Sequence, residues 1–171
     1  MHAIRILSAM TLAVAASLAP VAAQAGEDTT FTAPLSASQE VPANASLARG
    51  QAVFRLSADG SELDYRLIVA NLENPIASHI HLAPAGVNGP IVVFLYGPVA
   101  PGAGPTSGVL ATGTITADDL RGALAGEPLS ALVDEIRAGN AYVNVHTFDG
   151  VDPITGLPGD IPSGEIRGQI G

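Results

Sequence analysis

The β-strand pattern of this chain is clearest in Gln51–Ala70, which has the sequence QAVFRLSADGSELDYRLIVA. Apolar residues stand at every second position from Leu63 to Val69, and a period of two places them on one face of a β-strand. The Asp59-Gly60 pair between the two halves is typical of a hairpin turn. This stretch therefore predicts two antiparallel strands, half-buried and joined by a tight turn.

Short apolar runs of this kind recur along the chain, separated by turns rich in glycine and proline. They predict strands at Phe31–Leu35, Gln51–Leu56, Glu62–Ala70, Ala77–Leu82, Ile91–Tyr96, Val109–Ile115, Ala141–Thr147 and Gly164–Ile170. The run Ile91–Tyr96 is apolar without alternation, so we expect both of its faces to be covered, as in the middle of a sandwich. Gly97–Gly108 is expected to be a surface loop.

One segment has helical periodicity. Between Pro128 and Ala138, apolar residues recur at the spacing i, i+3, i+4 and i+7, with Gly139 at the C-terminal cap position. The fold prediction is all-β: an antiparallel β-sandwich, Greek-key-like, of roughly seven to nine strands, with one or two short helices inserted between Thr116 and Ala138.

The functional hypothesis rests on three histidines in predicted strands. His79 and His81 flank Ile80 in a predicted strand, so their side chains lie on one face. The one other histidine beyond the N-terminal segment, His146, belongs to another predicted strand, where Asn144 and Tyr142 share its face. If the two strands are neighbours, the three imidazoles meet and could bind a transition metal, with copper or zinc as candidates. The alternative is that the histidines are structural, hydrogen-bonded or solvated.

The N-terminal segment is expected to be removed from the mature protein. Met1–Ala25 has a short basic opening, an uncharged apolar run and a small-x-small sequence at Ala23-Gln24-Ala25. We therefore predict a signal peptide at residues 1–25 and a single domain at residues 26–171, secreted or periplasmic. The apolar run is short for a membrane span and is interrupted by Pro20.

The chain is acidic and has neither cysteine nor lysine. Its formal net charge is −9, so nucleic acid and anionic membrane surfaces are poor candidates as partners. Without cysteine, packing alone must hold the exported domain together. Near the C-terminus, Glu165 and Arg167 share a strand face, which we interpret as a cross-strand ion pair or a solvated edge.

Several motifs together resemble the CHRD domain, a module named for its occurrence in chordin and found alone in many exported microbial proteins. The matching segments are Leu35–Pro42, Gly50–Leu56, His79–His81 with Asn88–Pro90, Ala141–Thr147 and Gly164–Gln169. The resemblance spans Phe31 to Ile170 and implies an all-β extracellular domain. It supplies no enzyme activity.

The histidines alone also resemble those of copper-zinc superoxide dismutases, which have an H-x-H pair on a β-strand and a third histidine far away in the sequence. That resemblance covers His79, His81 and His146 alone. The chain lacks a fourth copper histidine, a histidine-rich zinc loop and the cysteines of that family.

Three functions remain open from the sequence. The favoured one is a non-enzymatic binding or structural module that holds a metal ion through His79, His81 and His146. The alternatives are a copper-dependent redox enzyme, similar to superoxide dismutase, and a metal-free module for extracellular protein interaction or adhesion. No catalytic residue is assigned.

Overall fold

The structure is a computed structural model that describes residues 29–171. The predicted signal peptide and its cleavage before Gly26 lie outside the described residues. Eight antiparallel strands form one sheet, in the order β5-β4-β7-β8-β1-β2-β3-β6. Their bounds are β1 Thr30–Ser36, β2 Arg49–Leu56, β3 Leu63–Glu73, β4 Pro75–Leu82, β5 Ile91–Tyr96, β6 Pro105–Ile115, β7 Ala141–Thr147 and β8 Ile166–Gln169. The prediction of an all-β, antiparallel fold is confirmed.

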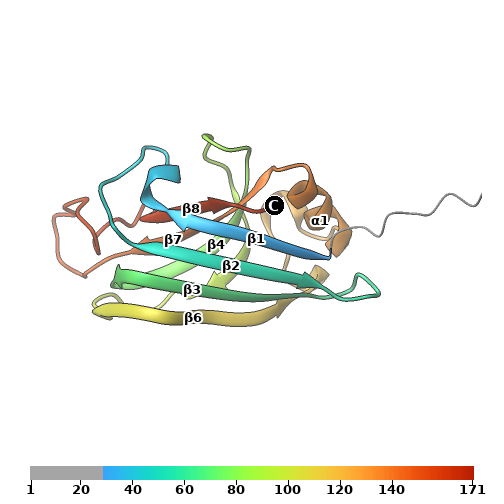
Figure 1. The fold of residues 1–171 in the computed structure, drawn as a ribbon, viewed down its shortest axis with the longest axis horizontal. Helices are drawn as coiled ribbons and strands as arrows, with labels where there is room; N and C mark the ends of the chain where they lie inside the picture. Colours follow the sequence, from blue (N-terminus) through green and yellow to red (C-terminus); the bar gives the residue numbers. More distant parts are fainter. Residues whose placement is uncertain (1–28) are drawn as a thin grey trace, which may run out of the picture.

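This sheet curls until its two edges approach each other. Figure 1 shows β1, β2, β3 and β6 passing in front of β4 and β7. The edge strand β5 comes near the other edge strand, β6, and two hydrogen bonds help to close the gap. The hydroxyl of Tyr65 on β3 donates to the Leu95 carbonyl at 2.6 Å, and the Arg121 amide donates to the Val92 carbonyl at 2.8 Å. The expected sandwich is thus a single, nearly closed sheet.

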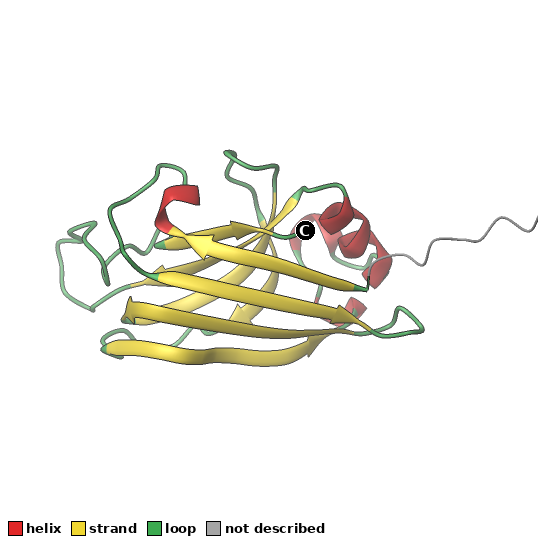
Figure 2. Ribbon diagram, in the orientation of Figure 1, coloured by secondary structure: helices red, strands yellow, loops and turns green. Residues whose placement is uncertain are grey.

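Helical segments are few within the described residues. The α-helix α1 spans Leu129–Arg137, and three 3₁₀ turns lie at Ala37–Gln39 (η1), Ala117–Asp119 (η2) and Gly122–Leu124 (η3). Helix α1 lies at one end of the sheet and buries Leu129, Leu132, Val133 and Ile136, the apolar stripe expected from its periodicity (Figure 2). Among residues 29–171, none of the helices is both long and apolar enough to span a bilayer.

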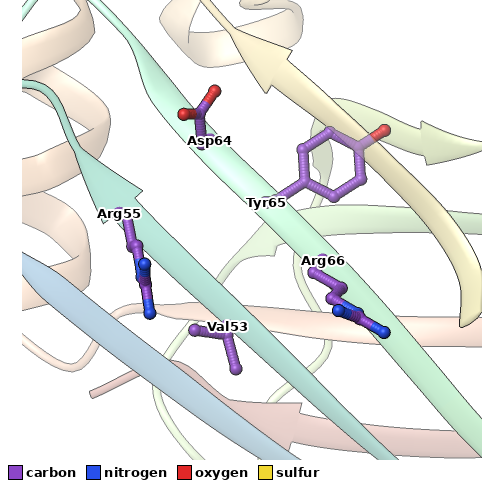
Figure 3. A pocket seen from close by; sticks show the side chains of 5 residues that line it. All are labelled: Val53, Arg55, Asp64, Tyr65 and Arg66. Carbon is purple, nitrogen blue, oxygen red and sulfur yellow. The ribbon is translucent and has the colours of Figure 1, made fainter.

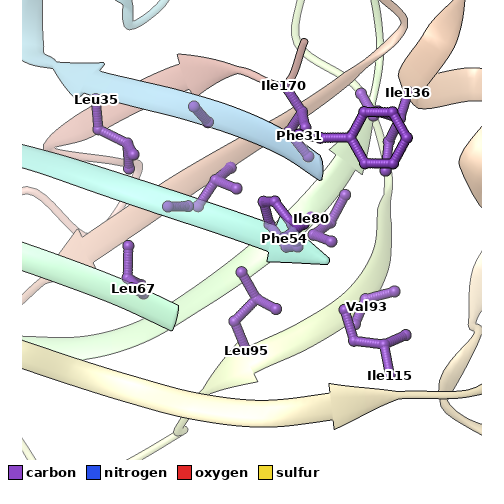
Figure 4. Packing of buried hydrophobic residues seen from close by; sticks show 14 of the residues in the cluster. Phe31, Leu35, Phe54, Leu67, Ile80, Val93, Leu95, Ile115, Ile136 and Ile170 are labelled. Atoms are coloured by element: carbon purple, nitrogen blue, oxygen red, sulfur yellow. The ribbon is translucent and has the colours of Figure 1, made fainter. Parts of the chain in front are cut away.

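The core fills the inside of the curled sheet. Alternate residues of each strand point inward, as the burial of every second residue in β1 illustrates. Figure 4 shows side chains from strands distant in sequence, such as Leu35, Leu67 and Ile80, converging on one interior. Phe54 and Ile80 are fully buried there. The opposite face of β4 and β7, which carries the histidines, is therefore turned away from this core.

Two predictions about single strands are wrong. β5 is an edge strand and not a central one: Phe94 points outward and is 49 % exposed, while Val92, Val93 and Leu95 are buried. Phe94 packs against the histidine cluster described below. The lack of apolar–polar alternation in β5 therefore did not indicate a strand in the middle of the sheet. β6 begins at Pro105, inside the expected loop, because its first residues pair with the end of β3.

Candidate functional site: a three-histidine cluster

The strand register brings the three histidines together. β4 and β7 are antiparallel neighbours in which Ala77 pairs with His146 and His79 pairs with Asn144. His79, His81 and His146 alternate with core residues, so all three side chains emerge on the outer face of this pair of strands. His79 and His81 are almost completely buried there, at 7 % and 8 % exposure, and His146 is half-buried. The predicted convergence of these residues is present in the structure.

The ring nitrogens of the cluster lie close enough to share a ligand. One nitrogen from each histidine falls within 4.8 Å of the other two. The shortest separation, 3.0 Å, joins His79 Nδ1 to His146 Nε2. Metal–nitrogen bonds of about 2.0–2.1 Å place neighbouring ligand nitrogens roughly 3.3–3.6 Å apart. Small side-chain rotations would bring the three nitrogens into that range, so the cluster could hold a metal ion.

Two backbone carbonyls orient the rings. His81 Nδ1 lies 2.9 Å from the Gly89 carbonyl oxygen, and His146 Nδ1 lies 2.9 Å from that of Pro162. Because a carbonyl can only accept a hydrogen bond, both Nδ1 atoms carry the hydrogen and both Nε2 atoms present a lone pair. The Nε2 atom of His81 is buried and has no hydrogen-bond partner among residues 29–171. Metal-binding histidines are typically oriented in this way.

Their electrostatic environment keeps the histidines neutral. Burial lowers the pKa of His79 to about 4, with repulsion from His146 and His81 as smaller contributions. Burial also lowers the pKa of His81 and of His146, partly opposed by the hydrogen bonds to the two carbonyls. A neutral imidazole is the form that binds a metal ion. Little proton competition is therefore expected at neutral pH.

Aromatic rings and a buried arginine enclose the cluster. The Phe94 ring lies edge-on to His79, with ring centroids 4.8 Å apart. Tyr142 stacks on His81 at 4.9 Å with 9° between the planes, and the guanidinium of Arg167 lies 3.4 Å from the centre of the Tyr142 ring. His81, Tyr142 and Arg167 thus form three stacked layers.

Arg167 also supports the turn that orients His81. It donates hydrogen bonds to the Pro84 carbonyl at 3.2 Å and to Asn88 Oδ1 at 3.3 Å, while the Gly89 amide donates to the Tyr142 hydroxyl at 3.1 Å. Arg167 is 1 % exposed, so its interpretation as a solvated edge residue is wrong. The arginine stacks on Tyr142 instead of lying in solvent.

Glu165 is also buried and does not form the expected surface pair. It is fully buried, and its carboxylate accepts hydrogen bonds from the Ser46 and Thr147 hydroxyls and from the Gly159 amide. These bonds tie the loop before β2, the last residue of β7 and the loop after β7 to the start of β8. Both carboxyl oxygens of Glu165 therefore accept hydrogen bonds within the protein, which gives this residue a structural role.

A second buried carboxylate lies beyond Asn144. Asn144 Nδ2 donates to Glu40 Oε1 at 3.4 Å, while its own Oδ1 has no partner in the described part of the chain. Burial raises the pKa of Glu40 to about 7, a shift that the Arg167 charge opposes. Glu40 falls within the CHRD-like segment Leu35–Pro42, but no periodicity indicated its burial, since it follows a 3₁₀ turn outside any strand. The predicted neighbours Tyr142 and Asn144 do lie on the His146 face, and Tyr142 contacts His81.

Family comparison fits this architecture. The family model for the CHRD domain matches residues 31–152. The chain belongs to the CHRD domain family. All three histidines lie within the matched residues, whereas β8 with Arg167 lies beyond them, although the resemblance noted from the sequence extended to Ile170. No curated protein and no solved structure matches this CHRD chain.

Proposed function

We propose that this CHRD domain protein is an exported, non-enzymatic binding or structural module that holds one transition-metal ion, copper or zinc, through His79, His81 and His146. Its location would be secreted or periplasmic, after removal of residues 1–25. In that setting an extracellular protein partner is compatible with the fold. The acidic charge argues against nucleic acid as a partner.

The observation that carries this proposal is the buried, unpartnered Nε2 atom of His81. A buried polar atom without a partner costs about 1–3 kcal/mol, so it is rarely left unused. It belongs to a cluster in which His146 Nε2 also presents a lone pair. A metal ion between these nitrogens would satisfy them together.

Metal binding also makes a specific demand on His79. Since His146 Nε2 has no hydrogen, His79 Nδ1 must donate the 3.0 Å hydrogen bond between them in the metal-free protein. To use this nitrogen as a ligand, His79 must move its hydrogen to Nε2. A neutral imidazole can make that change without a net change of charge.

Two alternative functions have less support than metal binding by a non-enzymatic module. A copper-dependent redox enzyme is favoured by the H-x-H pair and third histidine on neighbouring strands, but the chain lacks the fourth histidine and the cysteines of superoxide dismutases. Its negative charge would also fail to steer an anionic substrate such as superoxide. A metal-free interaction or adhesion module would leave His81 Nε2 buried without a partner.

The test is metal analysis and thermal denaturation of the purified protein. One copper or zinc ion per chain is expected, and a free-ion concentration 100 times the dissociation constant should add about 2.7 kcal/mol of stability. His81→Ala and His146→Ala should each abolish that gain and leave the metal-free fold intact. Gln51→Ala, on β2, serves as the control and should keep it. A wild-type protein that gains no stability from either metal would contradict the proposal.

Export is tested separately. Mass spectrometry of the protein recovered outside the cytoplasm should give a chain that begins near Gly26. A recovered chain that retains residues 1–25 would overturn this part of the proposal without affecting the metal site.

A further inference from the structure

The arginines of residues 29–171 divide into two groups. Four of the six make interactions with other residues of the chain, although the protein is strongly acidic. These are Arg49 with the Ala48 carbonyl, Arg121 with the Asp118 and Leu120 carbonyls, Arg137 with Asp134, and Arg167 in the stack described above. The other two, Arg55 and Arg66, have no hydrogen bond or ion pair with any described residue, and both are exposed.

These two arginines are neighbours. In the β2–β3 register, Arg55 pairs with Asp64 and Val53 pairs with Arg66, so the two arginines are diagonal on one face. They line the same hollow of about 400 Å³, together with Val53, Asp64 and Tyr65. Figure 3 shows Val53 between the two guanidinium groups. This hollow lies on β2 and β3 and is separate from the histidine cluster on β4 and β7.

Neither of the other polar groups in the hollow forms a hydrogen bond or ion pair with these two arginines. Asp64 Oδ1 accepts a hydrogen bond from the Thr114 hydroxyl at 2.6 Å, and Figure 3 shows the Asp64 carboxylate directed away from both guanidinium groups. The Tyr65 hydroxyl donates to the Leu95 carbonyl. Like charges on neighbouring strand positions are destabilising. The chain has sixteen acidic residues, yet Arg55 and Arg66 form an ion pair with none of those described, including Asp64, the strand partner of Arg55.

We propose that this hollow is a binding site for a small dicarboxylate. Guanidinium groups bind planar carboxylates through two parallel hydrogen bonds, and two diagonal arginines offer one such fork to each end of a short diacid. Val53 provides an apolar contact for the carbon chain between the carboxylates. The volume suits a small molecule. A long polyanion is disfavoured because the net charge of −9 repels it.

The experiment is calorimetric titration of the full protein at low ionic strength with succinate, acetate and inorganic phosphate in separate runs. Succinate should bind saturably with one molecule per chain. Arg55→Gln and Arg66→Gln should each weaken binding about tenfold or more, since each removes one charge-assisted fork. The control Arg49→Gln removes the same charge from the same strand and should leave succinate affinity almost unchanged.

Four outcomes would overturn the proposal. One is the absence of saturable succinate binding to the wild-type protein. A second is succinate binding that survives Arg55→Gln and Arg66→Gln. A third is an equal loss in Arg49→Gln, which would show a response to net charge alone. The fourth is equally tight binding of phosphate or acetate, which would refute the dicarboxylate class. Thermal denaturation of each variant verifies that it is folded.

Discussion

Replacing Arg167 tests the support of the histidine cluster. Its guanidinium lies 3.4 Å from the centre of the Tyr142 ring and donates to Pro84 and Asn88 in the turn that presents the Gly89 carbonyl to His81. Arg167→Gln removes the cation from the stack and is too short to reach the turn. The Tyr142 ring that stacks on His81 and the Gly89 carbonyl that accepts its hydrogen bond should therefore both be held less firmly.

The magnitude follows from these contacts. A desolvated cation–π contact contributes about 2 kcal/mol, and each hydrogen bond from a charged group about 1.5–3 kcal/mol. The two hydrogen bonds here are long, at 3.2 and 3.3 Å, so we expect Arg167→Gln to lower the free energy of unfolding by about 3–5 kcal/mol. Urea denaturation at pH 7 measures this loss. Metal affinity should also fall, by about tenfold, because the residues that contact a ligand histidine hold its ring in the orientation that binds the metal.

Two further variants separate support of the site from loss of charge. Arg167→Lys keeps the charge without the planar group and should fall between wild type and Arg167→Gln. Arg121→Gln removes an exposed arginine and should change stability by less than about 0.5 kcal/mol. Arg167 does not support the histidine cluster if Arg167→Gln is as stable as Arg121→Gln, or if Arg167→Gln binds the metal as tightly as wild type.

Three other measurements test the roles of Glu40, Gly164 and the neutral histidines. Because the folded-state pKa of Glu40 is raised from 4.5 to about 7, its stabilising contribution is complete below pH 4.5 and is lost as pH rises through 7, a change of about 3 kcal/mol. Urea denaturation of Glu40→Gln between pH 4.5 and 8 should show a weaker pH dependence than wild type, and an unchanged dependence would refute the assignment. Gly164→Ala places a methyl group against Glu40 and Asn144 at a positive φ of 131° and should cost about 2 kcal/mol or more. Gly126→Ala, also at positive φ but with open space around it, should cost less; equal losses would mean that crowding at Gly164 plays no part. Because burial lowers the pKa of all three histidines, the metal-loaded protein should release its ion on dialysis well below pH 6.5, and release at or above pH 6.5 would contradict the neutral cluster.

Local periodicity made much of the fold and the histidine cluster predictable. The H-x-H pattern fixes His79 and His81 on one face of a strand whatever the tertiary fold, and the boundaries of β5 and β7 follow from hydrophobic runs bounded by turns. The metal-site hypothesis required β4 and β7 to be neighbours, because only then does His146 lie near His79 and His81. Local periodicity does not predict this adjacency, which comes from the order of the strands in the sheet.

Long-range partners could not be predicted in the same way. Arg167 reaches Tyr142 because β8 is the next strand beyond β7, and residues far apart in sequence, Glu40 and Asn144, meet through a loop with no periodicity. Phe94 shows why the position of β5 was wrongly predicted. An apolar residue on the outer face of an edge strand covers His79, and the sequence does not distinguish such a contact from central burial.

X-ray absorption at the metal edge, on protein loaded with one equivalent of copper or zinc, shows whether the three histidines are the metal ligands. Three imidazole nitrogens at about 2.0–2.1 Å are predicted in the first shell, with the outer-shell scattering typical of histidine rings. The spectrum of His146→Ala should lose one imidazole contribution. A first shell of oxygen atoms alone, or a spectrum identical in wild type and His146→Ala, would contradict a metal site built by His79, His81 and His146.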